Sequence, residues 1–154
     1  MRIVLHLEHL RHFQNQGSIL FEDLVSADDC FALEIKLRHF VESISKNTLD
    51  ARWRDNIFRT LPEVAALVKK RHLDVFAANL VHRPRLLLVS DFWVLPEDSI
   101  PEREEDCLLL LSLSGDKVGQ GVFFVGPYPT ELYFPQSGET ALLLAFSSAG
   151  IPIS

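Results

Sequence analysis

The sequence predicts an α+β fold in which N-terminal helices pack on a C-terminal core of short strands. Residues 1–84 repeat apolar side chains at helical spacing, whereas residues 85–154 alternate short apolar runs with turn-forming segments. Six of the seven glycines lie between positions 115 and 150, and seven of the eight prolines lie at or beyond position 84. The second half therefore has the pattern of short strands and turns that is typical of a small β-barrel or jelly roll. Because no linker separates the halves, we expect one domain over residues 1–154.

The N-terminal segment predicts a helix followed by a short strand. Ile3, Leu7 and Leu10 fall on one helical face, and Gly17 stands where a left-handed residue commonly ends a helix. The next four residues, Ser18–Phe21, are a short β-branched and aromatic run, which is typical of a strand. We therefore expect a helix, a turn at the glycine and a strand.

Two longer helices are expected after this strand. Ser26 with Asp29 three residues later makes a capping-box pattern, and the helix that follows should run to about Ser45. A second helix is predicted from Pro62, which suits a first helical turn, to about Val81. The polar and basic segment between the two helices is expected to be a loop or a short helix.

The C-terminal half contains five candidate strands. Their separators are rich in glycine, proline, serine and aspartate, the residues that favour turns. The predicted strands are Arg85–Leu95, Cys107–Leu113, Gly121–Val125, Glu131–Phe134 and Thr140–Ser147.

The charge distribution bears on whether the protein binds nucleic acid. The net charge is −6 at pH 7, but residues 1–85 carry a net +2 and residues 86–154 a net −8. An acidic half disfavours broad contact with nucleic acid, whose affinity depends on neutralising phosphates. One local basic face remains, formed by Lys46, Arg52, Arg54, Arg59 and Lys69–Arg71.

Hydropathy and cysteine content favour a cytoplasmic protein without a membrane segment. Apolar runs such as Cys107–Leu111 are far shorter than the roughly 20 residues that span a bilayer. Polar residues interrupt the apolar stretch near the N-terminus, so a secretory signal is not expected. With only Cys30 and Cys107, a disulfide framework is not expected, and a reducing compartment fits better.

Several segments resemble phytanoyl-CoA-dioxygenase-like proteins, which belong to the non-haem Fe(II)/2-oxoglutarate oxygenases. The resemblance is carried by residues 13–37, with Phe13 and Gly17 at a helix end, and by residues 61–85, 119–124 and 138–146. It implies a double-stranded β-helix (jelly-roll or cupin-like) core beneath the helices. The chain is still more similar to a small chlamydial family of uncharacterised proteins, for which a role as a divalent-cation-dependent regulator has been proposed.

In the oxygenase family, a His-x-Asp/Glu pair, a later histidine and a basic anchor hold Fe(II) and 2-oxoglutarate. The first pair corresponds here either to Val89–Asp91 or to Glu102–Glu104, and neither begins with His. Residues 147–149, where the later histidine is expected, are Ser, Ser and Ala, and Lys117 lies in a turn-like segment. The resemblance therefore implies the scaffold without iron or cosubstrate ligands. The six histidines all precede the core: His6, His9, His12, His39, His72 and His82.

We assign no catalytic, cofactor-binding or metal-binding residue. The candidates for a pocket are Asp91 and Trp93, which alternation places on one face of a strand, and His82, which precedes that strand. Asp91 and Trp93 could face a barrel interior or point outward. His82 could reach the barrel mouth and join Asp91 in an unorthodox site, or simply cap a helix end.

Three functions remain open. The leading hypothesis is a degenerate oxygenase-fold protein that acts as a non-catalytic binding or regulatory module of unknown partner. The alternative is a divergent metal-dependent enzyme with a rearranged carboxylate site around Asp91 and Glu102 or Glu104, which would favour Mg²⁺, Ca²⁺ or Mn²⁺. A second alternative is a divalent-cation-dependent transcriptional regulator, which the basic residues between 46 and 71 motivate.

Overall fold

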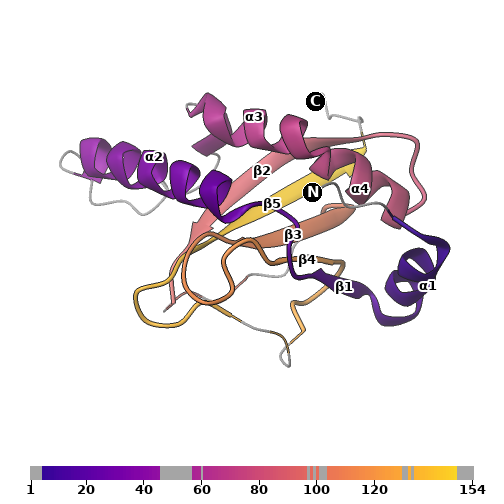
Figure 1. Cartoon of the computed structure of the whole chain (residues 1–154). Coiled ribbons are helices and arrows are strands. Elements are labelled where there is room, and N and C mark those ends of the chain that lie inside the picture. Colours follow the sequence, from indigo (N-terminus) through magenta and orange to yellow (C-terminus); the bar gives the residue numbers. More distant parts are fainter. Residues whose placement is uncertain are drawn as a thin grey trace.

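The computed structural model describes residues 5–45, 57–59, 61–96, 98, 100, 104–129, 132 and 134–148. The mixed α+β class predicted from the sequence is confirmed (Figure 1). In chain order the elements are α1 (Leu7–Gln16), β1 (Ser18–Phe21), α2 (Ala27–Ser45), the 3₁₀ helix η2 (Ile57–Arg59), α3 (Pro62–Arg71), α4 (Leu73–Leu80), β2 (Leu86–Val94), β3 (Cys107–Ser112), β4 (Gly121–Phe124) and β5 (Ala141–Ser148).

The five strands form a single antiparallel sheet in the order β1-β4-β3-β5-β2. Strand β1 comes from the helical half of the chain and pairs with β4, with Ser18 opposite Phe124 and Phe21 opposite Gly121. In Figure 1, α2, α3 and α4 lie over one face of this sheet, and α1 lies at the β1 end. The first strand therefore ties the N-terminal segment to the far edge of the sheet.

The helices and one face of the sheet enclose the main core. Leu33 and Leu37 of α2 are buried there, together with Leu109 and Leu144 of the central strands. The opposite face carries a second buried cluster, which includes Leu110 of β3. All six residues of β3 are buried, and the first five, Cys107–Leu111, are apolar in succession instead of alternating with polar residues. The sheet is thus covered on both faces.

The predicted helix end at Gly17 and the predicted helix start at Ser26 are confirmed. Gly17 ends α1 in the left-handed conformation, with φ of 74°, and its N–H donates to the carbonyl of Phe13 at 2.7 Å. The N–H of Asp29 donates to the hydroxyl oxygen of Ser26 at 3.2 Å, as the capping pattern predicts. No helix in the described part of the chain is both long and apolar enough to cross a membrane.

The single helix predicted over Pro62–Val81 is wrong, because the chain breaks at His72. His72 adopts φ of 56° and ψ of 37°, which ends α3 and begins α4. Val68 and Leu73 are both buried. In one uninterrupted helix these two side chains would point roughly 140° apart, since each residue advances the helix by about 100°. The left-handed residue turns α4 so that both helices bury their apolar faces.

Two other predicted segments lie partly outside the described residues. Of the loop or short helix expected over 46–60, the described part is the 3₁₀ helix η2, and residues 46–56 and 60 lie outside the description. In the strand expected over Glu131–Phe134, Glu131 and Tyr133 lie outside it as well. The described residues Leu132 and Phe134 do not belong to any strand. Both pack over the second face of the sheet.

Candidate functional site

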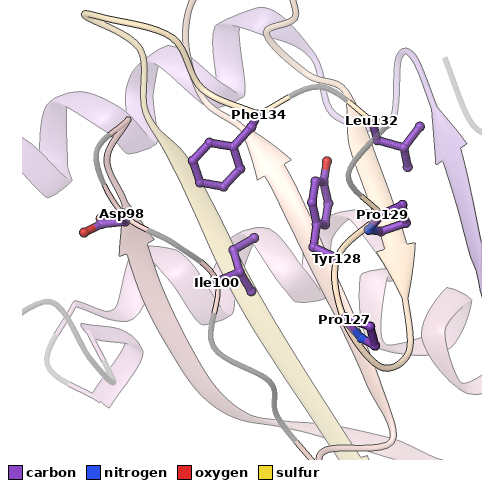
Figure 2. Close-up of a pocket in the computed structure, with 7 residues that line it drawn as sticks. All are labelled: Asp98, Ile100, Pro127, Tyr128, Pro129, Leu132 and Phe134. Atoms are coloured by element: carbon purple, nitrogen blue, oxygen red, sulfur yellow. The ribbon is translucent and has the colours of Figure 1, made fainter.

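The candidate site is a pocket over the face of the sheet that the helices do not cover. Two connections build it, one after β2 and one after β4, and its volume is about 360 Å³. The chain leaves β4 through Gly126, whose φ of 76° suits glycine, and enters the proline-flanked segment around Tyr128. The lining residues are Asp98, Ile100, Pro127, Tyr128, Pro129, Leu132 and Phe134 (Figure 2).

Aromatic rings hold one wall of this pocket in place. The ring of Tyr128 meets that of the fully buried Phe124 edge-on, with centroids 5.1 Å apart. It also meets the ring of Phe134 at 6.3 Å. Such edge-to-face pairs stabilise a wall beyond the effect of burial alone, by about 0.5–1.5 kcal/mol each. Burial raises the pKa of Tyr128 to about 12, so its side chain is a neutral phenol at physiological pH.

The polar content of the pocket is small. Figure 2 shows Ile100, Tyr128 and Phe134 around a common space, whereas the carboxylate of Asp98 points away from it. An oxygen of Asp98 accepts the backbone N–H of Leu95 at 2.7 Å, which holds the carboxylate within its own turn. The site therefore offers mainly apolar and aromatic surface.

The sequence does not predict this pocket. It predicts only a turn over Gly126–Thr130, between two of the expected strands. Its one available signal was Tyr128 between two prolines, because a rigid aromatic residue is unusual in a plain turn. Ile100 comes from a different connection, and only the folded sheet brings the two together.

Asp91 and Trp93 lie on the helix-covered face of the sheet. The carboxylate of Asp91 is 1% exposed and accepts the N–H groups of Ile57 at 2.5 Å and Phe58 at 2.9 Å. Trp93 is buried in the main core, and the guanidinium of Arg38 lies 5.8 Å from its ring centroid. The structure thus uses Asp91 to fix η2 on the sheet, and neither residue lines the pocket described above.

His82 lies at the other end of β2. It is exposed, has φ of 56°, and borders a groove of about 340 Å³. Asp91 is five residues along β2 from Leu86, or roughly 16 Å at the rise of a strand. The structure therefore brings His82 near Asp106 and away from Asp91. The groove is lined by Phe13, Gln14, Gly17, Leu80, Val81, His82, Arg83, Asp106 and Val125.

All six histidines belong to the helical layer or its connections. His6 and His9 begin α1, where the ring of His9 packs against Phe21 at 5.3 Å. The other four, His12, His39, His72 and His82, are exposed. Within the described residues, no three His, Cys, Asp or Glu side chains form a group that could hold a metal ion.

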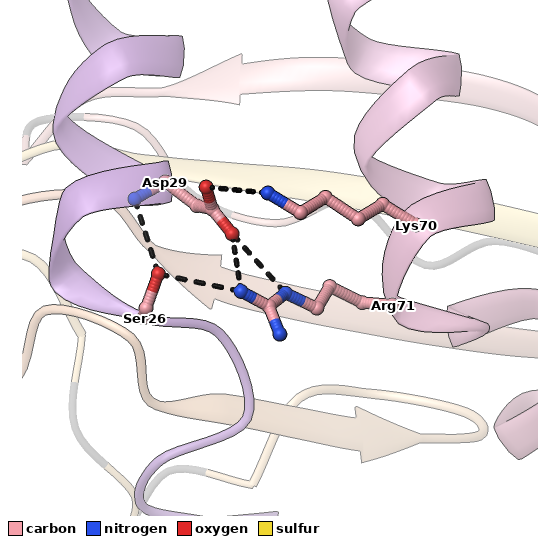
Figure 3. Close-up of polar contacts among 4 residues, drawn as sticks. All are labelled: Ser26, Asp29, Lys70 and Arg71. Atoms are coloured by element: carbon pink, nitrogen blue, oxygen red, sulfur yellow. Dashed lines mark hydrogen bonds and ion pairs between the residues drawn. The ribbon is translucent and has the colours of Figure 1, made fainter. Parts of the chain in front are cut away.

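The basic run at the end of α3 is partly engaged in an ion-pair cluster (Figure 3). Arg71 and Lys70 both bind the carboxylate of Asp29, with Lys70 Nζ 3.1 Å from Oδ1. The guanidinium of Arg71 also reaches the hydroxyl oxygen of Ser26 at 3.5 Å. These two cations therefore join α3 to α2. Of the predicted basic face, Lys46, Arg52 and Arg54 lie outside the described residues.

Solved structures similar to this one include CT296 and an oxygenase-fold enzyme. Two structures of CT296 from Chlamydia trachomatis share 48% identity with the chain. They cover 97% and 96% of it, and 99% of their own length, with TM-scores of 0.86 and 0.87. SnoK, a non-haem α-ketoglutarate-dependent carbocyclase from nogalamycin biosynthesis, shares 12% identity. The match covers 92% of this chain and 83% of SnoK with a TM-score of 0.65, and it shows a likeness of fold alone.

A family model covers nearly all of the sequence. The model described as a domain of unknown function, DUF5070, matches residues 1–152. A search of curated proteins gave no match. The chain therefore belongs to the DUF5070 family, and its fold is related to that of an α-ketoglutarate-dependent oxygenase.

Proposed function

We propose that the protein is a non-catalytic binding module that keeps an oxygenase-like scaffold and lacks its iron chemistry. In this proposal the five-stranded sheet is the larger sheet of a double-stranded β-helix. The connections after β2 and β4 take the place of the smaller sheet. The likeness to SnoK supports the scaffold, and so does the burial of both faces of the central strands.

The observation that carries the proposal is the position of the histidines. Iron of this class needs two neutral imidazoles and a carboxylate on one side of the metal, with the remaining positions open. Every histidine precedes residue 83, and all six lie on the helices, between them or at their ends. The loop-covered face of the sheet instead presents side chains such as Leu110, Val122 and Phe124. This donor set does not fit Fe(II).

The cosubstrate has no suitable anchor either. 2-Oxoglutarate is normally held by an Arg or Lys, because a planar guanidinium or an ammonium pairs with its distal carboxylate. After Arg85 the chain has only Arg103 and Lys117. Lys117 is exposed in the turn between β3 and β4, away from the strands, and Arg103 lies outside the described residues. The late strands therefore offer no basic side chain to the sheet face.

Free, buried thiols support a cytoplasmic setting as part of this proposal. Cys30 and Cys107 are both buried and unbridged, and burial raises the pKa of each thiol to about 12. Thiols of this kind behave as small apolar side chains in a reducing compartment.

The proposal is tested by turnover of 2-oxoglutarate. The full chain is reconstituted anaerobically with Fe(II), exposed to oxygen and 2-oxoglutarate, and assayed for succinate beside an active oxygenase of the same class. We expect succinate at the level of a heat-denatured control. Fe(II)-dependent and 2-oxoglutarate-dependent succinate formation above that level would overturn the non-catalytic assignment.

A further inference from the structure

We propose that the pocket between the connections after β2 and β4 binds a small, uncharged aromatic molecule. This inference deepens the proposed function, because it gives the binding module a site and a ligand class. The juxtaposition that carries it is Ile100 from one connection facing Tyr128 and Phe134 from the other (Figure 2).

The size of the pocket fits a small molecule. Its volume of about 360 Å³ lies within the range typical of ligand sites. A cavity of about 150 Å³ holds a benzene ring, so this one has room for a molecule of about two fused or linked rings. A bulkier ligand would have to leave part of its surface in solvent.

The wall chemistry selects aromatic ligands. Tyr128 is positioned by its contact with the buried Phe124, and Phe134 presents a second ring to the same space. A planar ligand can stack on or meet these rings edge-on without any rearrangement of the sheet, because the supporting ring is already fixed. Pro127 and Pro129 limit the motion of the Tyr128 segment and reduce the entropy lost on binding.

Charge selects against ions. Among the described residues that line the pocket there is no cation, and their one carboxylate, that of Asp98, accepts the backbone N–H of Leu95. An anionic ligand would meet no positive partner among these residues and would face the net charge of −8 on residues 86–154. A buried cation would need a carboxylate aimed into the space, and Asp98 points away. A neutral ligand avoids both costs.

The test uses two related fluorescent probes. 1-Naphthylamine has two fused rings and is uncharged at neutral pH, and 5-aminonaphthalene-1-sulfonate has the same two rings with one negative charge. The full chain is titrated with each probe, and methyl NMR shifts of Ile100 and Leu132 are recorded. We expect saturable binding of the neutral probe with shifts at both methyl-bearing residues. The sulfonate should bind more weakly by about tenfold or more, which corresponds to about 1.4 kcal/mol.

Two variants locate the site. Ile100→Trp fills the pocket and should weaken binding of the neutral probe by about tenfold or more. Ile35→Ser removes an apolar side chain of α2 that is 57% exposed and lies outside the pocket, and it should leave binding unchanged. Circular dichroism checks that each variant is folded. If Ile100→Trp does not fold, the methyl shifts of the unmodified protein still decide the location.

Three results would overturn the inference. These are binding that does not saturate, equal or tighter binding of the sulfonate, and methyl shifts that spare Ile100 and Leu132. Sedimentation gives a fourth. If the protein is a dimer that Ile100→Trp converts to a monomer, a second copy of the chain occupies the pocket instead of a small molecule. None of these results depends on succinate formation, so failure here is distinguishable from failure of the non-catalytic assignment.

Discussion

Arg71 and Asp29, which are 42 positions apart in the sequence, join the end of α3 to the first turn of α2. The Nε of Arg71 donates to Oδ2 of Asp29 at 3.1 Å, and Lys70 takes the other carboxylate oxygen (Figure 3). The Arg71 and Asp29 side chains are only 27% and 20% exposed, so solvent screens the pair less than it screens a surface salt bridge. Two of the three basic residues at the end of α3, Lys70 and Arg71, therefore hold two helices together.

Removal of this cluster should destabilise the fold more than removal of a looser pair between the same helices. We expect Arg71→Met to lower the free energy of unfolding by about 1–2 kcal/mol, because charge-assisted hydrogen bonds to Asp29 are lost. The matched control is Lys36→Met, whose ammonium lies 4.0 Å from Glu63 with both side chains well exposed. Its effect should stay below about 0.5 kcal/mol. Urea unfolding at pH 7 measures both, and equal effects would contradict the ranking.

Stability should depend on pH through Asp29. Its hydrogen bond with Arg71, aided by Lys70, lowers the pKa of the carboxyl below its ordinary value. Because the folded-state pKa is the lower one, the stabilisation is fully present above about pH 4 and is lost as the pH falls through the folded-state pKa. The stability difference between the unmodified chain and Asp29→Asn should therefore shrink on acidification from about pH 6 toward about pH 3. This interval spans the ordinary carboxyl pKa of about 3.9. A constant difference across that interval would show that the carboxylate charge is not responsible.

Asp91 should behave as a structural residue. Truncation by Asp91→Ala leaves the buried N–H of Ile57 and the partly buried N–H of Phe58 without their carboxylate, which should cost about 2–4 kcal/mol. Asp91→Asn keeps one acceptor oxygen and should cost less. Thermal and urea unfolding measure the two effects. An Asp91→Ala protein as stable as the unmodified one would mean that η2 is held by other contacts.

Gly119 should tolerate a methyl group far worse than Gly138. Both have positive φ, 88° and 84°, so an alanine at either position is strained by the backbone conformation. At Gly119 the added Cβ would also collide with the backbone carbonyl oxygen of Val25, whereas at Gly138 nothing lies within 4 Å. Gly138→Ala should cost about 1 kcal/mol and Gly119→Ala about 3 kcal/mol or more, since backbone cannot move aside cheaply. Similar losses of unfolding free energy in both variants would contradict the close approach of Gly119 to the Val25 carbonyl.

Local signals in the sequence were sufficient for much of the fold. Gly17 and Ser26 mark a helix end and a helix start by their own backbone chemistry, and both act as predicted. The break at His72 could not be predicted in this way, because histidine, although enriched among the non-glycine residues with positive φ, adopts that conformation in only a small fraction of cases. It follows from the need of α3 and α4 to bury separate faces, which only the assembled sheet imposes.

The site was less accessible from the sequence. Alternation placed Asp91 and Trp93 on a common face but could not say whether that face meets helices or loops. With all six positions of β3 buried, periodicity in the central strand does not mark an inside and an outside. The pocket residues Ile100 and Tyr128 are brought together by strand order, which no local pattern encodes.

In our proposal the chain keeps an oxygenase-like scaffold and does not bind iron and 2-oxoglutarate together. Anaerobic titration of the full chain with Fe(II) and 2-oxoglutarate tests this most directly, because their chelate in such enzymes has a metal-to-ligand charge-transfer absorption that needs no further substrate. We predict that this absorption stays at the level of the two reagents mixed without protein. A saturable charge-transfer band at one equivalent of Fe(II) per chain would contradict the account.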